Sequence, residues 1–529
     1  MDEPQRRVSK FAAIFAGGTM VSRLLGLVRD IVCGKLIGAV SLDAFLVAFK
    51  LPNMLRDIIG EGASNAAFVP VFSESLEKES EEAYRELVSA VMSAMLVVLA
   101  VLTIAGVILA PMLLRGLNLI TLVTGAKQLD PTKIDLMASL ARWTFPYLFL
   151  IGMTVFAMAP LFTKGRYAIP SWSPTLLSIA VIVSCLLLRD LFPDQGYALV
   201  FGVWLGGVAQ LAVQYVAMGK HTGVWRPNFR LNHPGVRAAL WLLVPVLFGQ
   251  AAGEINKLVD TLFAASLETG TVKALSYANR LVLLPLSVFA VAISVAVLPT
   301  ISKSVARGDL RETRATLMQG FRQTCFLILP AMLGLIVLRK PIVTLLFQWG
   351  EFSAADAERT ATALGIYGAG LLSFAWVKVA VAGFYAAQNT RTPVVVASMC
   401  MALNIVLNVM LVRPLQFRGL ALATTISFTA NFLLLYIMLC DRYGRLWDEA
   451  FINTLTRIVV AAVAMAAVAG GVHFRVAAAF ETDGLGARTL RAVLPIAAGL
   501  ATYVGLCSAL RVRELGDLFE VLRGDRRRG

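Results

Sequence analysis

Long apolar runs without a charged residue recur from one end of this 529-residue chain to the other. Residues 87–114, 143–163, 281–302 and 419–440 are examples. A helix needs roughly 20 apolar residues to cross the hydrocarbon core of a bilayer. The runs are too long, and too poor in two-residue alternation, for the strands of a membrane barrel. Because 58% of the residues are hydrophobic and 15% are charged, the sequence predicts an all-α polytopic membrane protein and excludes soluble classes.

The apolar runs predict fourteen membrane-spanning helices. An even number places both termini on one side of the membrane. Assigning Lys and Arg to alternate connections puts about 26 on the side of the termini and about 14 opposite, which makes both termini cytoplasmic by the positive-inside rule. The net charge of +15 is therefore a topology signal, and we expect no nucleic-acid partner. The expected spans are residues 8–38, 43–73, 87–114, 137–163, 170–188, 196–218, 236–265, 274–301, 320–338, 360–386, 392–412, 419–440, 452–472 and 491–510.

Two halves of the chain share landmarks at one offset. The segment "PLFTKGRYAIP" at 160–170 aligns with "GFYAAQNTRTP" at 383–393, and Gly196 aligns with Gly419. This indicates two six-helix lobes related by a pseudo-two-fold axis along the membrane normal. Chance similarity between apolar helices is the alternative. The expected division is an N-lobe at 1–220, a C-lobe at 221–445, two extra helices at 446–512 and a basic cytoplasmic tail at 513–529.

Ionisable residues occur inside the expected spans. Each costs roughly 2.5 to 3.5 kcal/mol at the centre of a membrane helix, so together they must face protein or water. At 100° per residue, they form polar arcs on the first, second and seventh spans. We therefore expect a water-filled cavity lined by these faces. The cations are Arg23, Arg29, Lys35, Lys50, Arg56, Lys257, Arg280 and Lys378, and the acids are Asp30, Asp43, Asp57, Glu61, Glu254 and Asp260.

Two interpretations of these charges stay open. A guanidinium stays protonated and matches phosphate oxygens two at a time, which favours anion contact by the four arginines Arg23, Arg29, Arg56 and Arg280. For Lys50, Asp57 and Glu254, ion pairing that holds helices together is the favoured role.

The second span also contains helix-weakening residues. Pro52 removes a backbone donor, and Gly60 and Gly62 weaken the helix further along. We predict a hinge for alternating access here, with easier helix packing as the alternative.

Three segments carry a family resemblance. They are "SRLLGLVRD" at 22–30, "DAFLVAFKLPNMLRDIIGEGASNAAFVPVFSE" at 43–74 and "VDTLFAASLETGTVKALSYANRLVLLP" at 259–285. With fourteen spans, the chain resembles the MurJ (MviN) lipid II flippases of the MOP exporter superfamily. The resemblance implies movement of lipid II, the undecaprenyl-diphosphate-linked peptidoglycan precursor, from the inner to the outer leaflet of the bacterial cytoplasmic membrane by alternating access. It implies substrate contacts by Ser22, Arg23, Arg29, Asp30, Asn53, Arg56 and Arg280, and a lipid-tail groove at the last two helices.

The same resemblance implies a driving force rather than a cofactor. Membrane potential or a sodium ion would drive transport, and the matching cation-site positions are Asp260, Asn404, Asn408 and Thr425. One acid stands where two are expected, and the asparagines have interhelical hydrogen bonding as an alternative role. We expect a monomer whose partners are lipid II and membrane lipids.

Other functional classes have less support. The sequence has no P-loop, no catalytic nucleophile constellation and no metal-ligand spacing, so we expect neither an enzyme nor a metal site. A cation-coupled drug exporter of the same superfamily would line its cavity with acids and aromatics. An oligosaccharide-lipid flippase stays open as the alternative. A membrane glycosyltransferase would need acids on long outer loops, and loop 115–136 offers Asp130 and Asp135.

Overall fold

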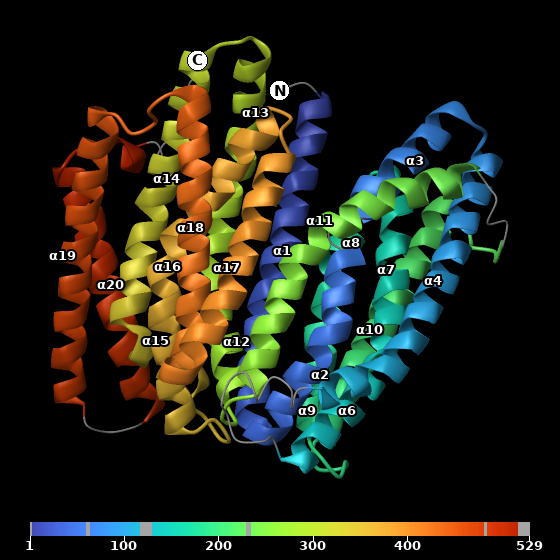
Figure 1. Cartoon of the computed structure of the whole chain (residues 1–529), viewed down its shortest axis with the longest axis horizontal. Coiled ribbons are helices and arrows are strands. Elements are labelled where there is room, and N and C mark those ends of the chain that lie inside the picture. Colours follow the sequence, from blue (N-terminus) through green and yellow to red (C-terminus); the bar gives the residue numbers. More distant parts are fainter. Residues whose placement is uncertain (1–2, 60–63, 117–129, 229–233, 481–483, 517–529) are drawn as a thin grey trace. The chain divides into compact units, whose positions relative to one another are not determined.

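The computed structural model describes residues 3–59, 64–116, 130–228, 234–480 and 484–516, and these residues form helices and short connections without any strand (Figure 1). This confirms the all-α fold. Among these residues, eleven helical segments are long and apolar enough to cross a membrane, and each overlaps one of the expected spans. They comprise α4 (Glu81–Arg115), α6 (Pro131–Thr144) with α7 (Pro146–Thr163), α8 (Ala168–Trp172) with α9 (Pro174–Leu188), α10 (Gly196–Thr222), α12 (Thr271–Pro285) with a π-helical turn (Leu286–Ala290) and α13 (Val291–Ala306), α14 (Leu310–Val337), α16 (Ala354–Ala386), α17 (Arg391–Leu415), α18 (Phe417–Tyr443), α19 (Glu449–Ala479) and α20 (Leu485–Ala509).

The three other expected spans are also helical. They correspond to α1 (Glu3–Leu36), α2 (Ala39–Ile58) with α3 (Ser64–Lys78), and α11 (Pro234–Ala265). Among the described residues, these helices carry most of the charges that lie inside the expected spans. The count of fourteen spans therefore stays a prediction. A further short helix, α15 (Arg339–Phe347), follows α14.

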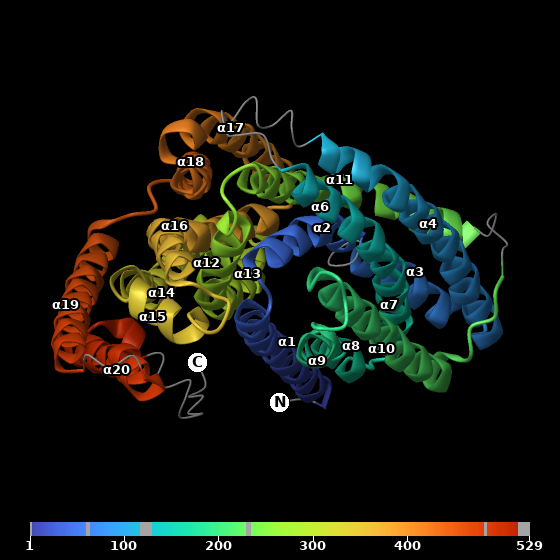
Figure 2. The same cartoon turned by 90° about the horizontal axis from the view of Figure 1, so that it is seen from below.

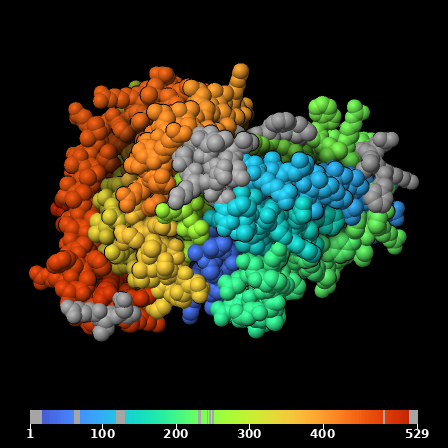
Figure 3. Space-filling model, turned by 60° about the horizontal axis from the view of Figure 1, so that its bottom comes forward, coloured from blue at the N-terminus to red at the C-terminus, as the bar shows by residue number. Residues whose placement is uncertain are grey.

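The chain divides into two compact units. The first comprises Met1–Lys273 and Trp349–Phe352, and the second comprises Ala274–Gln348 and Ser353–Gly529. By packing, α11 belongs to the first unit, where it contacts α2, α3 and α4. The lobe boundary at 220/221 was predicted from the sequence repeat. The division into compact units does not test that repeat, so the boundary stays a prediction. The space-filling view shows side chains closely packed over the visible face of each unit (Figure 3).

The core of the first unit joins α11 to the helices before it. Phe68 of α3 packs edge-on against Phe156 of α7, with ring centroids 5.1 Å apart. Val236 and Leu243 of α11 are buried in the same apolar cluster. The burial of these side chains fixes the face that α11 presents to α3 and α4.

The core of the second unit is aromatic. Trp376 of α16 lies 4.9 Å from Phe432 of α18, measured between ring centroids, and its indole N–H donates to the carbonyl oxygen of Phe321. The last two helices, α19 and α20, pack against each other, and α19 also packs on α14 (Figure 2). The buried hydroxyl of Tyr503 on α20 donates to the carbonyl oxygen of Phe326 at 2.6 Å. These contacts hold the α19–α20 pair in the second unit, and its role as a lipid-tail groove stays a prediction.

Candidate functional site

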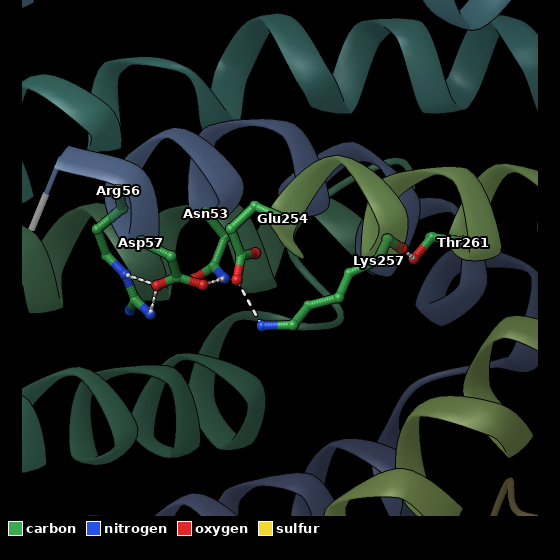
Figure 4. A network of polar contacts seen from close by, with 6 residues as sticks. All are labelled: Asn53, Arg56, Asp57, Glu254, Lys257 and Thr261. Atoms are coloured by element: carbon green, nitrogen blue, oxygen red, sulfur yellow. Dashed lines mark hydrogen bonds and ion pairs between the residues drawn. The ribbon is translucent and has the colours of Figure 1, made fainter. Parts of the chain in front are cut away.

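Two arginines inside the first unit are paired with the acid that follows them. Arg29 of α1 contacts Asp30 with 2.8 Å between Nη2 and Oδ1, and Arg56 of α2 contacts Asp57 at 2.5 Å between the same atom types. In both pairs the Nε–H donates to the same oxygen. Asn53 donates to the other carboxylate oxygen of Asp57 at 3.1 Å (Figure 4). The arginines are thus oriented by residues of their own helices, with 19% and 25% of their side chains exposed.

Helix α11 supplies a third pair. Lys257 donates from Nζ to Oε1 of Glu254 at 2.5 Å, and the Thr261 hydroxyl donates to the carbonyl oxygen of Lys257. Of the Lys257 side chain 60% is exposed, against 10% of the Glu254 side chain. Within the described chain, Oε2 of Glu254 is buried and has no hydrogen-bond partner. The pair therefore has a buried, half-satisfied carboxylate and an ammonium open to solvent.

The pairs on α2 and α11 lie together because these two helices pack against each other. The polar ends of Arg56, Asp57 and Lys257 project to the same side of the pair (Figure 4). Lys50 of α2 lies within electrostatic range of Glu254 and of the other three groups. Three cations here face two carboxylates, so the cluster carries one excess positive charge. We call Lys50, Asn53, Arg56, Asp57, Glu254 and Lys257 the α2/α11 polar cluster.

Tyr147 of α7 lies next to this cluster. Its phenol is within electrostatic range of Arg56, Arg29 and Asp57, and its ring packs 5.5 Å from that of Phe49 on α2. A tyrosine inside an apolar run gave no sequence signal for this position. Ring contact with α2 is what places its hydroxyl near the arginines of two helices.

The structure brings together part of the predicted site. Arg29, Asp30, Asn53 and Arg56 lie on polar faces of the first unit, as described above. Ser22 and Arg23 lie earlier on α1, with Ser22 half-buried and Arg23 exposed. Arg280 is half-buried on α12 in the second unit, and its contribution to one shared site stays a prediction. Sequence reasoning left Lys50 and Lys257 out of the binding set, although both already lay on the predicted polar faces.

The predicted hinge is described in part. Pro52 is buried within α2, which ends at Ile58, while Gly60 and Gly62 lie outside the described residues. The next helix, α3, begins at Ser64. Hinge motion in this part of the chain stays a prediction.

The four predicted cation-site residues are distributed over both units. Asp260 lies on α11 of the first unit, while Asn404 and Asn408 lie on α17 and Thr425 on α18 of the second. Asn408 donates to Oδ1 of Asn404 at 3.0 Å, a bond within one helix. The Thr425 hydroxyl donates to the carbonyl oxygens of Ala421 and Ile366, at 2.9 and 3.1 Å. A common cation site stays a prediction.

Asp43, which was expected on the polar face of the cavity, is instead buried and binds backbone groups. It is fully buried at the start of α2 and accepts hydrogen bonds from the backbone N–H groups of Gly270 and Lys273. The Lys273 ammonium lies 4.6 Å from the ring centroid of Phe352. Lys133 of α6 donates to the Thr269 hydroxyl nearby, at 3.3 Å. These contacts connect α2 and α6 to the link between α11 and α12.

The sequence matches one protein family over most of its length. The family model described as lipid II flippase MurJ matches residues 34–485. A probable lipid II flippase MurJ from Vibrio cholerae serotype O1 is 34% identical over 529 residues, covering 97% of this chain and 98% of the relative. A lipid II flippase MurJ from Burkholderia cenocepacia is 31% identical over 496 residues, covering 93% and 94%.

Solved structures show the same fold. A lipid II flippase MurJ in an inward closed conformation superposes with a TM-score of 0.76 at 24% identity, covering 95% of this chain and 99% of that one. An inward-facing multidrug resistance MATE family transporter of the MOP superfamily superposes with a TM-score of 0.67 at 15% identity, covering 82% and 98%.

Proposed function

This chain belongs to the lipid II flippase MurJ family, and we propose that its α2/α11 polar cluster and Arg29 hold the diphosphate of lipid II during transport. The protein is a transporter and not an enzyme: it moves lipid II from the inner to the outer leaflet by alternating access. A diphosphate is the most highly charged part of this cargo and needs cationic partners inside the membrane. The excess positive charge of the α2/α11 polar cluster is the observation that supports this role.

The arginine pairs are compatible with substrate binding. A guanidinium has five N–H donors, and the contact of Arg56 with Asp57 uses Nε–H and one Nη2–H. The arginine therefore has the donor capacity to hold the carboxylate and a phosphate oxygen at once. Asp57 fixes the direction of the planar fork, so less side-chain entropy is lost when the phosphate arrives. Arg29 makes the same kind of contact with Asp30.

In the Lys257–Glu254 ion pair, the ammonium can exchange its carboxylate partner for the substrate. The Lys257 ammonium is exposed and is held by one oxygen of a buried carboxylate. A diphosphate competes with Glu254 for the ammonium because it carries more negative charge. Release at the other membrane face then returns Lys257 to Glu254, which keeps substrate binding from becoming too tight to reverse.

The proposed setting is the bacterial cytoplasmic membrane, with both termini cytoplasmic and the chain active as a monomer. The distribution of Lys and Arg between alternate connections supports this orientation. The charge of the α2/α11 polar cluster favours an anionic lipid over the cationic substrates that a drug exporter of the same superfamily would bind. Coupling to a sodium ion stays a prediction, which transport assays with and without sodium would test.

The test measures flipping of fluorescent lipid II in proteoliposomes and growth of a flippase-depleted bacterium. Replacing Arg29 or Arg56 by alanine should lower the flipping rate about a hundredfold, because each removes a charged hydrogen-bonding partner of the cargo. Arg280→Ala, in the second unit, tests whether the predicted contribution of that arginine is of the same size. Arg85→Ala is the matched control, since Arg85 is an exposed arginine on α4 paired with Glu81. Membrane insertion is checked by protein level. Full growth and flipping with all three arginines removed together would exclude the proposed role.

A further inference from the structure

A pocket of about 350 Å³ is formed by α15, α16 and α18 of the second unit and is open at the surface, where Arg339 is exposed. It is separate from the α2/α11 polar cluster, because every residue of its lining belongs to the second unit. Its walls are largely apolar, with one charged side chain and two hydroxyls. The lining residues are Arg339, Thr362, Gly365, Ile366, Ala369, Leu422 and Thr425.

Arg339 gives the pocket its charge. Its Nη1 donates to the carbonyl oxygen of Ile336 in the last turn of α14, at 3.2 Å. Among the residues that the structure describes, no carboxylate lies within ion-pair distance of Arg339, whereas the adjacent Lys340 pairs with Glu358 at 3.1 Å. The start of α15 adds the positive end of a helix dipole. The pocket therefore favours an anion and disfavours a cation beside Thr425.

Gly365 keeps this space open. A Cβ atom built on Gly365 would lie 3.1 Å from Cδ of Arg339. The aliphatic stem of the arginine thus runs across the glycine of α16, and a side chain there would displace it. Thr362 lies one turn away on the same helix and adds a hydroxyl to the same wall.

The remaining lining identifies the kind of anion. Ile366, Ala369 and Leu422 offer apolar surface next to the guanidinium. Both α16 and α18 are candidate membrane helices, and Ile426, the neighbour of Thr425, is 39% exposed. A ligand with one anionic group on an apolar body matches an apolar pocket that contains few polar groups. Free inorganic phosphate would leave the apolar wall uncovered.

We propose that this pocket binds the phosphate group of a membrane lipid, with Arg339 as its ionic partner and the apolar wall against the adjoining carbons of the lipid. Two lipids share this chemistry: a bilayer phospholipid and the diphosphate lipid that the protein transports. The pocket accepts the phosphate through guanidinium N–H donors, and the volume is ample for a phosphate group with several attached carbons.

Native mass spectrometry of the purified full-length chain tests this inference with three probes: phosphatidylglycerol, undecaprenyl diphosphate and inorganic phosphate. Arg339→Gln should lower bound lipid about tenfold, because it removes a charged contact while keeping the side chain polar. Lys340→Gln is the matched control, since it removes the neighbouring cation outside the pocket. The lipid that loses more binding in Arg339→Gln identifies the source of the phosphate.

A second variant tests whether lipid binding needs the volume of the pocket as well as the charge of Arg339. Ala369→Leu retains Arg339 but fills the pocket from its apolar wall, and it should reduce binding of the same lipid to a similar degree. Thermal unfolding of each variant shows whether the fold is intact. Equal lipid binding by Arg339→Gln and Lys340→Gln would overturn the proposal, and so would an Arg339-dependent preference for inorganic phosphate over both lipids. Neither outcome alters the role of the α2/α11 polar cluster, whose variants are assayed by flipping.

Discussion

The Asp43 carboxylate accepts a hydrogen bond from the backbone N–H of Gly270 at 2.5 Å, although 227 positions separate the two residues. A second oxygen of Asp43 accepts from the backbone N–H of Lys273 at 2.9 Å. Gly270 has a φ of 91°, a left-handed conformation that glycine adopts without steric cost. The buried acid thus fixes the link between α11 and α12 against the start of α2.

Removing this acid should destabilise the protein. Asp43→Ala leaves two buried backbone donors without their acceptor, which costs about 2 to 4 kcal/mol of unfolding free energy. Asp43→Asn retains one acceptor oxygen and should fall between the alanine variant and the wild type. Thermal unfolding in detergent measures the loss as a lower midpoint.

Asp130→Ala is the control for Asp43→Ala. Asp130 is exposed at the start of α6 and accepts from Thr132, whose hydrogen bonds lower the pKa of the Asp130 carboxyl. Loss of this cap costs about 1 kcal/mol. A midpoint for Asp43→Ala no lower than that of Asp130→Ala would contradict the structural role of Asp43.

Glu254→Gln should tighten substrate binding. The change removes a negative charge beside Lys50 and Lys257 without changing side-chain volume, so the α2/α11 polar cluster becomes more positive. The Kd for a fluorescent lipid II analogue should fall by about three- to tenfold, on the order of 1 kcal/mol. Flipping should slow, because release becomes harder.

The control for this variant is Glu358→Gln, which removes an exposed acid paired with Lys340 in the second unit. Its Kd for the same analogue should match the wild type. Weaker binding by Glu254→Gln would mean that Glu254 positions Lys257 for the substrate instead of competing for it.

Hydropathy and helical periodicity predicted much of this molecule. The polar faces of α1, α2 and α11 follow from residue spacing alone, and the packing of α2 on α11 places Arg56 near Lys257. The apolar spans follow equally directly, because lipid requires long uncharged helices.

Long-range backbone contacts could not be predicted. Asp43 was grouped with the cavity face by its position on the helix, yet its partners are backbone N–H groups that no side-chain pattern marks. Tyr147 and Arg339 were missed for a related reason. Tyr147 lies within an apolar run and Arg339 directly follows one, and both have neighbours on helices distant in sequence.

Close helix packing in the first unit should depend on Gly206. A Cβ atom there would lie 2.8 Å from the Cα of Leu177, so α9 and α10 approach through backbone contact. Gly206→Ala should destabilise the fold by about 1 to 3 kcal/mol through overpacking. Gly471 of α19 has no heavy atom within 4 Å of its built Cβ, so Gly471→Ala should leave the unfolding midpoint equal or higher, since alanine favours helix. Equal effects at both positions would refute the packing argument.

Arg56→Lys tests whether charge alone suffices for transport. Lysine keeps the positive charge but lacks the planar fork that binds Asp57 through Nε and Nη2. Without that fork the ammonium is less well oriented and cannot hold carboxylate and phosphate oxygens in two directions, so the flipping rate should fall about tenfold or more. Arg85→Lys, at an exposed ion pair on α4, is the control and should flip at the wild-type rate. A wild-type rate for Arg56→Lys would show that the site needs a positive charge here and no defined geometry.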